Sequence, residues 1–558
     1  MNTILTKSEN FLSENGLPIK KMNKFANEAI GNSLSTRTII KNTSTMKKLL
    51  TMAALTLFSA MGLHAQLLTT TVEQGEIEGV EHEGFALYKN IPYAEAPVGN
   101  LRWKAPVKKK PWKGVYKADR WGDRPPQPID PNQNGADLGM SEDCLYLSVE
   151  TPAKNKNEKL PVFVMIHGGG FLTGSYSGTQ ESFVREGIIY CSIEYRLGAF
   201  GFMAHPELAK ESEKKLSGNY GILDQVMALK WIHDNIAAFG GDPDRITIAG
   251  ESAGGISVSI LCASPLTKGL FSGAISESGS SFWPIGKERN GNTAMLTAQA
   301  AEQGGLDFQK KLGAKNIRQM RKLAAMDIVK NTPMEAFWPV VDGYAITDDQ
   351  YKLYEQGRYN DVNVIMGTNS DEGSMFCRPM KVADYEAKVR SVYGEWADKV
   401  LALYPAKNEQ DTWYGQADIF RDGSFGWGTY AWANLQTQTG KGKVYMYYFD
   451  QDSENTIFRS PRGGAIHVAE MPFAYGYKFG NGKMTDTDNH MQQIMSRYWI
   501  NFTKTGNPNQ DGLPYWTAYQ KGQPTVMVMK NGFHLAPVQN QKQMDFFEAY
   551  FKAKRLNP

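Results

Sequence analysis

Short apolar runs alternate with helical patterns through the middle of the chain, and this alternation predicts the fold class. Residues 160–166 (LPVFVMI) and 188–193 (IIYCSI) are nearly unbroken apolar runs, typical of strands buried on both faces of a sheet. Residues 218–241 have helical spacing of apolar side chains and end in two glycines, which predicts a helix. Further strands are predicted over 245–250, 273–279, 362–368 and 443–449, and a small-residue helix over 252–264. The alternation predicts an α/β fold with a mostly parallel central sheet and helices on both faces.

The flanking segments add elements of other kinds. Residues 69–80 alternate polar and apolar side chains, as in an antiparallel hairpin, and residues 144–152 read as another strand. Residues 316–330 predict one amphipathic helix, and residues 491–508 predict a helix closed by Gly506. No repeat or change of composition marks a linker, so we expect residues 66–558 to form a single domain with long loop and helical insertions over its site.

The first 65 residues differ from the rest in charge. They carry eight Lys/Arg against three Asp/Glu, whereas the remainder is nearly neutral. Residues 46–65 join Lys47 and Lys48 to an apolar stretch that ends in small residues, which is the pattern of a secretory signal peptide. We expect cleavage near Ala65/Gln66, export to the periplasm or the medium, and no stable membrane anchor. Residues 1–45 are expected to be a non-native or disordered extension ahead of a true start at residue 46.

Composition removes several classes of function. The chain is 41% hydrophobic and 21% charged with a net charge of +3, and no basic stripe suggests a nucleic-acid partner. Neither Cys-x-x-Cys nor His-Glu-x-x-His occurs, so no metal or other cofactor is expected. Four scattered cysteines do not form a dense disulfide framework, and their redox state stays open at this stage. These are Cys144, Cys191, Cys262 and Cys377.

The sequence Gly250-Glu-Ser-Ala-Gly254 is the first candidate for chemistry. A bare Gly-x-Ser-x-Gly is a weak signal, and a glycine-rich corner without catalysis is its alternative reading. Here the motif follows a predicted strand and opens a predicted helix, which is the context of a nucleophile elbow. We therefore predict that Ser252 is a nucleophile at the tip of a strained turn.

A nucleophilic serine needs oxyanion donors, an acid and a base. Residues 167–171 (HGGGF) follow a buried strand, and we expect the N–H groups of Gly169 and Gly170, with that of Ala253, to form the oxyanion hole. A merely flexible loop is the alternative. In α/β folds with a nucleophile elbow, the acid and then the histidine follow the serine along the chain. The candidate acids are Asp371 and Glu372, and the candidate bases are His467, His490 and His534; spacing alone does not choose among them.

Several motifs together resemble the carboxylesterase type B family, the cholinesterase-like branch of the α/β-hydrolase fold. The motifs are EDCLYL, HGGGF, YRLGAFGF, ITIAGESAGG, PVVDG, DEGS and YWINFTKTGNPN, in this order from about Gln74 to Tyr519. The signal peptide favours a bacterial exported member. In one respect the chain departs from the family, because the usual upstream partner of Cys144 is missing.

The resemblance implies a role for particular residues. It implies the triad Ser252, Glu372 and His467, with Glu251, Ser278 and Glu470 as buried neighbours. Arg102 with Glu142 and Arg196 with Asp224 resemble structural ion pairs of the family. Candidate pocket walls, each also a plausible core residue, are Phe171, Trp283, Phe337, Trp338, Met375 and Phe376.

The family also implies an activity and a substrate. We expect a serine hydrolase that cleaves small-molecule carboxylic esters through an acyl-enzyme, without a cofactor. The alternatives are an amide- or carbamate-cleaving hydrolase of the same fold and a non-catalytic binding protein of this family. Neither the ester nor the oligomeric state follows from the sequence.

Overall fold

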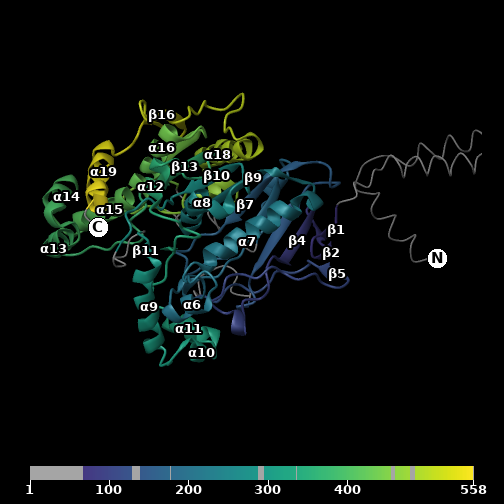
Figure 1. Cartoon of the computed structure of the whole chain (residues 1–558). Coiled ribbons are helices and arrows are strands. Elements are labelled where there is room, and N and C mark those ends of the chain that lie inside the picture. The colour runs from purple at the N-terminus through teal and green to yellow at the C-terminus, as the bar shows by residue number, and fades with distance from the viewer. Residues whose placement is uncertain are drawn as a thin grey trace, which may run out of the picture. The chain divides into compact units, whose positions relative to one another are not determined.

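The fold is built around one large sheet, seen in a computed structural model of the chain (Figure 1). The structure describes residues 67–128, 139–175, 178–286, 294–334, 336–453, 459–477 and 484–556, all within the compact unit Gln66–Pro558. The predicted extension and signal peptide, residues 1–65, lie outside the described residues.

The large sheet has eleven strands and a mostly parallel centre. Across the sheet they are β16 (Phe533–Pro537), β15 (Thr525–Met529), β14 (Val444–Phe449), β13 (Asn363–Asn369), β10 (Gly273–Glu277), β9 (Gly241–Glu251), β7 (Leu160–Ile166), β8 (Ile189–Ile193), β6 (Tyr146–Thr151), β4 (Phe85–Pro92) and β3 (Val80–His82). Pairing is parallel from β15 to β8 and antiparallel at both edges. The predicted parallel α/β sheet is confirmed.

Two small sheets flank this one. The first joins β1 (Thr69–Val72), β2 (Gly75–Glu78) and β5 (Val115–Lys117), and its β1–β2 pair is the predicted antiparallel hairpin. The second pairs β11 (Leu296–Thr297) with β12 (Val340–Val341).

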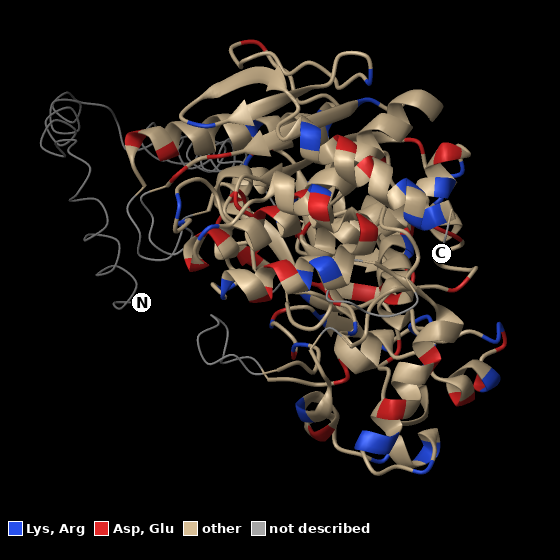
Figure 2. Cartoon of the chain, turned by 90° about the vertical axis from the view of Figure 1, so that its left-hand side faces the viewer, with Lys and Arg blue, Asp and Glu red and all other residues tan. Residues whose placement is uncertain are grey.

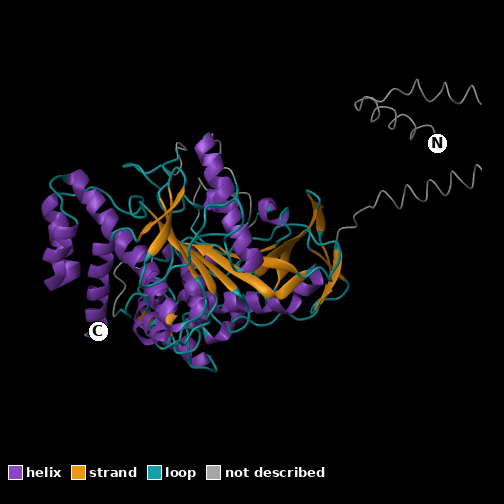
Figure 3. Cartoon of the chain, turned by 90° about the horizontal axis from the view of Figure 1, so that it is seen from above, coloured by secondary structure: helices purple, strands orange, loops and turns teal. Residues whose placement is uncertain are grey.

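Helices cover both faces of the large sheet, as the view from above shows (Figure 3). The α-helices are α4 (Glu181–Val184), α5 (Gly198–Phe202), α6 (Pro206–Glu211), α7 (Tyr220–Asn235), α8 (Ala253–Ala263), α9 (Ala298–Lys311), α10 (Ile317–Met320), α11 (Ala325–Asn331), α12 (Gln350–Glu355), α13 (Val382–Tyr393), α14 (Ala397–Leu403), α15 (Glu409–Phe420), α16 (Trp427–Thr439), α17 (Met471–Tyr475), α18 (Asp486–Thr505) and α19 (Gln541–Leu556). A π-helix, η6 (Arg421–Gly426), joins α15 to α16, and short 3₁₀ turns are η2 (Gly99–Leu101), η3 (Ile236–Phe239), η4 (Pro265–Thr267) and η5 (Gly394–Trp396).

Strand β7 explains why the central runs are apolar at every position. Val162 and Val164 belong to the hydrophobic core that also contains residues of α7 and α8, whereas Phe163 and Met165 belong to the core that contains residues of α17 and α18. All four side chains are at most 1% exposed. Because successive strand side chains point to opposite faces, a strand between two helical layers must be apolar throughout.

The prediction of one continuous helix over residues 316–330 is wrong. Residues 316–330 form α10 and α11 with a break after Met320. The Arg102 guanidinium donates to the carbonyl oxygens of Met320 and Leu323, at 3.2 and 2.9 Å. The Met320 carbonyl also accepts the N–H of Leu323 at 3.1 Å, so the helix ends in a turn whose carbonyls are capped by a side chain from a distant segment.

Candidate active site

Four neighbouring parallel strands of the central sheet have their carboxyl ends side by side. The segments that follow β7, β9, β10 and β13 carry, respectively, the glycine loop, Ser252, Ser278 and Glu372. The segment 459–477, downstream of β14, carries His467. Since the carboxyl ends of parallel strands form the usual ligand edge of an open α/β sheet, residues far apart in sequence are brought together there.

Ser252 occupies a strained turn between β9 and α8. Its backbone has φ 57° and ψ −122°, in the left-handed region that a residue with a side chain rarely adopts. Its N–H donates to the carbonyl of Glu277 at 2.9 Å. A Cβ on Gly250 would lie 2.5 Å from the backbone of Gly254, and a Cβ on Gly254 would lie 2.1 Å from the carbonyl oxygen of Ile166. Only glycine fits these two positions, so the turn is as tight as the sequence motif predicts.

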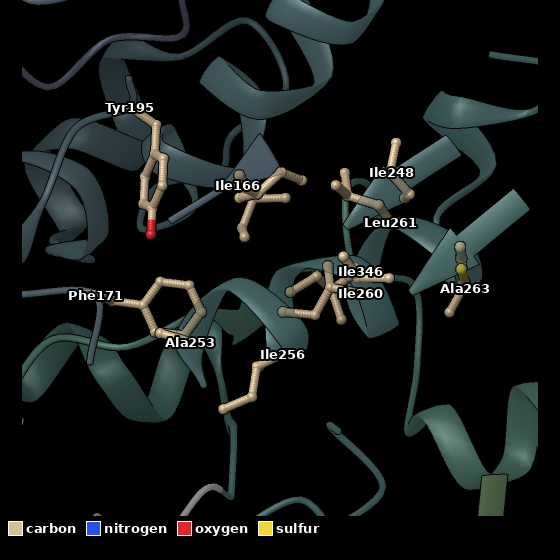
Figure 4. Close-up of a cluster of buried hydrophobic side chains, with 14 of the residues drawn as sticks. Ile166, Phe171, Tyr195, Ile248, Ala253, Ile256, Ile260, Leu261, Ala263 and Ile346 are labelled. Atoms are coloured by element: carbon tan, nitrogen blue, oxygen red, sulfur yellow. The ribbon is translucent and has the colours of Figure 1, made fainter. Parts of the chain in front are cut away.

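The glycine loop lies against the serine. A Cβ built on Gly168 would lie 3.2 Å from both Ser252 Cβ and Glu251 Oε2. Gly169 and Gly170 have φ of +98° and +62° and are exposed. Phe171 then turns into the core beside Ala253 and Ile256 of α8 (Figure 4). The loop therefore places two accessible backbone N–H groups near the start of α8.

His467 lies between two carboxylates. Its Nδ1 is 2.6 Å from Glu372 Oε2, and its Nε2 is 3.2 Å from Glu251 Oε1. Nε2 is buried and has no hydrogen-bond partner among the described residues, and Ser252 Oγ makes no hydrogen bond to it there. Hydrogen bonds of catalytic groups are often long in the absence of substrate and shorten when it binds.

The other candidates lie elsewhere. Asp371 accepts hydrogen bonds from Ser374, Ser460 and the Arg462 guanidinium, so it belongs to a neighbouring ion-pair network. His490 is exposed on α18, and His534 is exposed on the edge strand β16. Geometry thus singles out Glu372 and His467 as the acid and the histidine in contact.

Ser278 and Asn369 donate hydrogen bonds both to Glu372 and to Glu470, a further buried carboxyl group. Ser278 Oγ donates to Glu372 Oε1 at 2.6 Å and to Glu470 Oε1 at 3.5 Å. The Asn369 N–H donates to Glu372 Oε1 at 2.7 Å, and its side-chain amide donates to Glu470 Oε2. Asn369 was not predicted, although its position at the end of the strand before DEGS was a usable signal.

A further buried carboxyl group, Glu277, also escaped sequence reasoning. It is 0% exposed at the end of β10 and accepts hydrogen bonds from the Tyr475 hydroxyl and from Trp499 Nε1. Burial, reinforced by the charge of Glu470, raises its pKa well above the usual range of a glutamate. The two donors act against this rise, because hydrogen bonds donated to a carboxylate favour its charged form.

The charges around His467 shift several pKa values. Burial alone would lower the pKa of His467, but the carboxylates of Glu251 and Glu372 outweigh it and raise the pKa to about 9. Burial raises the pKa of Glu251 to about 8, against the opposing effect of His467. Burial, helped by Glu372, raises the pKa of Glu470 to about 7. The carboxylates around His467 therefore stabilise the imidazolium that forms when Nε2 accepts a proton.

The six candidate pocket residues separate into two groups. Met375 and Phe376 are exposed, and the edge of the Phe376 ring packs on the His467 ring at 5.3 Å. The others pack into the protein: Phe171 contacts Phe202 and Trp338, Phe337 contacts Phe308, and Trp283 contacts Phe551.

The two expected structural ion pairs are present. Arg102 Nε is 2.7 Å from Glu142 Oε2, and Arg196 Nε and Nη2 are each 2.7 Å from Asp224 carboxylate oxygens. All four cysteines are free thiols, so Cys144 is unpaired.

Three further features of the described residues concern their charges, possible metal ligands and long apolar helices. Basic and acidic residues are interspersed on the side shown in Figure 2. Within the described ranges, the His, Cys, Asp and Glu side chains form no group of three that could hold a metal ion. None of the helices described is both long and apolar enough to cross a membrane.

Comparisons with known proteins agree on one family. Residues 66–547 match the model of the carboxylesterase family. The para-nitrobenzyl esterase of Bacillus subtilis (strain 168) is 34% identical over 486 residues, covering 83% of this chain and 94% of its own length. The fumonisin B1 esterase of Sphingopyxis macrogoltabida is 31% identical over 487 residues, covering 81% and 85%.

A solved structure extends the agreement to the fold. A PNB esterase structure superposes with a TM-score of 0.73 at 30% identity, covering 86% of this chain and 99% of that one. The chain therefore belongs to the carboxylesterase family and has its α/β-hydrolase fold.

Proposed function

We propose that this protein cleaves carboxylic esters through an acyl-enzyme formed on Ser252, with His467 as general base and Glu372 as its acid partner. The observation that carries the proposal is the buried contact of 2.6 Å between His467 Nδ1 and Glu372, beside a serine with φ 57° at the start of α8. A strained serine, a histidine and a buried carboxylate are the parts of a nucleophilic hydrolase.

Each residue has a distinct task in the first half of the reaction. His467 Nε2 removes the proton of Ser252 Oγ as the oxygen attacks the ester carbonyl carbon. Glu372 holds the proton on Nδ1, which leaves Nε2 free to accept, and it stabilises the imidazolium that forms. The alcohol then leaves with the proton from Nε2, and water repeats the cycle on the acyl-enzyme.

The oxyanion is bound by backbone donors. We assign them to the N–H groups of Gly169, Gly170 and Ala253; the first two lie in the exposed glycine loop, and the third opens α8. Preorganised donors of this kind stabilise the developing charge without rearranging during the reaction. The positive end of the α8 dipole acts in the same direction.

We assign to Glu251 and Glu470 an effect on the pKa of the base, His467. Glu251 faces the same Nε2 that receives the serine proton, at 3.2 Å, so its negative charge favours the imidazolium of the transition state. Glu470 is linked to Glu372 through Ser278. The carboxylate next to the nucleophile in sequence thus acts on the base.

We propose ester cleavage and not amide cleavage as the reaction, because several relatives are named esterases. We further propose that the protein is exported and that residues 46–65 are removed. Amino-terminal sequencing of the protein secreted by its host would yield Gln66 as the first residue, and retention of residues 46–65 would contradict this.

The assignment is tested with p-nitrophenyl esters of increasing acyl length. Ser252→Ala should lower kcat/KM by several orders of magnitude, while the melting temperature stays near that of the parent. The residual rate should be about 10³–10⁴-fold above the uncatalysed rate. The non-catalytic alternative requires that the parent protein neither hydrolyses these esters nor reacts with an organophosphonate while it is folded. The preferred acyl length then indicates the size of the pocket.

A further inference from the structure

A π-helix lies next to the site, at a position where no sequence pattern predicts one. Residues 421–426 widen the helical path between α15 and α16, and Asp422 to Phe425 are buried. A π-helical turn is rare, costs regular hydrogen bonds and occurs frequently at functional sites. Its opened Gly423 carbonyl accepts a hydrogen bond from Trp283 Nε1 at 2.7 Å, which offsets part of this cost.

The π-helix brings an aromatic ring against the proposed base. The rings of Phe425 and His467 are stacked with a centroid distance of 5.1 Å and an interplanar angle of 6°. Phe425 is 4% exposed, so it does not form part of an open wall. Phe420, one helical turn earlier, packs on Phe425 at 5.6 Å and on Phe376 at 4.9 Å without a ring contact to His467.

Charged contacts fix the π-helix to both segments of the site. Arg421 donates to the carbonyl of Ser370 at 3.0 Å, two residues before Glu372, and to Asp418 at 2.7 Å. Arg462, on the segment of His467, donates to the same Asp418 oxygen at 2.7 Å and to Asp371 at 2.7 Å. Arg421 is 11% exposed and Arg462 is 18% exposed, so solvent screens these ion pairs only in part. The relative positions of the acid, the histidine and Phe425 are therefore set by one network.

We propose that Phe425 is a positioning residue for His467, and that the π-helix exists to hold its ring flat on the imidazole. The proposal rests on the proposed function, in which His467 is the base. The single hydrogen bond from Nδ1 to Glu372 leaves the imidazole able to tilt about that bond, and a ring packed on its face prevents this. The face of Phe425 also attracts the positive charge that the imidazole acquires in the transition state.

The matched pair Phe425→Leu and Phe420→Leu tests this assignment. Both variants remove one ring from the same aromatic cluster, but only the first removes the ring stacked on His467. We expect Phe425→Leu to lower kcat about tenfold with KM within about twofold, and to slow the labelling of Ser252 by an organophosphonate equally, because both reactions need the oriented base. Phe420→Leu should leave kcat near the parent value.

Two further variants keep the test decisive if Phe425→Leu does not fold. Phe425→Met retains volume without a ring and should show the same loss of kcat, whereas Phe425→Tyr retains the ring and should restore kcat to within about threefold of the parent. Equal losses of kcat in Phe425→Leu and Phe420→Leu, a change in KM alone, or full activity of Phe425→Met would overturn the proposal. Activity that survives Ser252→Ala would instead refute the nucleophile assignment, so the two failures are distinguishable.

Discussion

The contact between Glu251 and His467 leads to a quantitative prediction for Glu251→Gln. The substitution keeps the shape of the side chain and removes its charge 3.2 Å from Nε2. At this distance and an effective dielectric constant of about 20, two unit charges attract by about 5 kcal/mol. Burial raises the pKa of Glu251 to about 8, so the protonated form predominates near neutral pH and only a fraction of this attraction acts. We therefore expect a loss of about 1.4 to 2.7 kcal/mol, or about 10- to 100-fold in kcat/KM.

The same variant should change the pH profile in a defined direction. A charged Glu251 stabilises protonated His467 and helps raise its pKa to about 9. In Glu251→Gln the pKa of His467 should fall, and because the base must be neutral to accept the serine proton, the acid limb of kcat/KM should move to lower pH. The profile is measured with a p-nitrophenyl ester between about pH 5 and pH 10.

A second buried glutamate provides the control. Glu150 is 1% exposed on β6, and its carboxylate accepts from the backbone N–H of Gln180. Glu150→Gln should leave the acid limb in place. An unchanged kcat/KM and an unchanged acid limb in Glu251→Gln would refute the view that Glu251 acts on the base.

Three other substitutions give separate tests. Ser278→Ala removes the buried hydroxyl that donates to Glu372 at 2.6 Å, and should lower kcat/KM about tenfold in steady-state assays and the stability by about 1 to 3 kcal/mol. Gly254→Ala would place a Cβ 2.1 Å from a carbonyl oxygen of β7, and should destabilise the protein by about 2 kcal/mol or more in urea unfolding; parent-like stability would contradict the tight turn. Asp371→Asn breaks the contact with Arg462 and should cost about 3 kcal/mol of stability by the same assay, so a loss of activity without any loss of stability would count against a structural role.

The local features of the site could be predicted from the sequence because they depend on neighbouring residues. The turn at Ser252 requires small residues at fixed offsets, and the glycine loop follows directly after a buried strand, so both can be read from short motifs. The choice of Glu372 over Asp371, and of His467 over the later histidines, needed the family resemblance. Spacing along the chain does not say which carboxylate points to a distant imidazole.

The rest depends on tertiary contacts that leave no local pattern. Glu277 ends a strand that is buried throughout, and its partners Tyr475 and Trp499 are about 200 residues away, so nothing nearby indicates a buried carboxyl group. Phe425 lies in a π-helix and stacks on His467, and no local sequence pattern predicts either feature. The break after Met320 is likewise capped by Arg102, more than 200 residues upstream.

The central claim is that an acyl group is carried by Ser252, and direct trapping of the acyl-enzyme tests it. The enzyme is mixed with excess p-nitrophenyl acetate, quenched in acid during the burst of p-nitrophenol, digested, and mapped by mass spectrometry. An acetyl group on the peptide containing residues 246–263, localised to Ser252 and absent in Ser252→Ala, is the predicted result. Turnover with the acetyl group on another residue, or with no covalent intermediate and an active Ser252→Ala variant, would contradict the account.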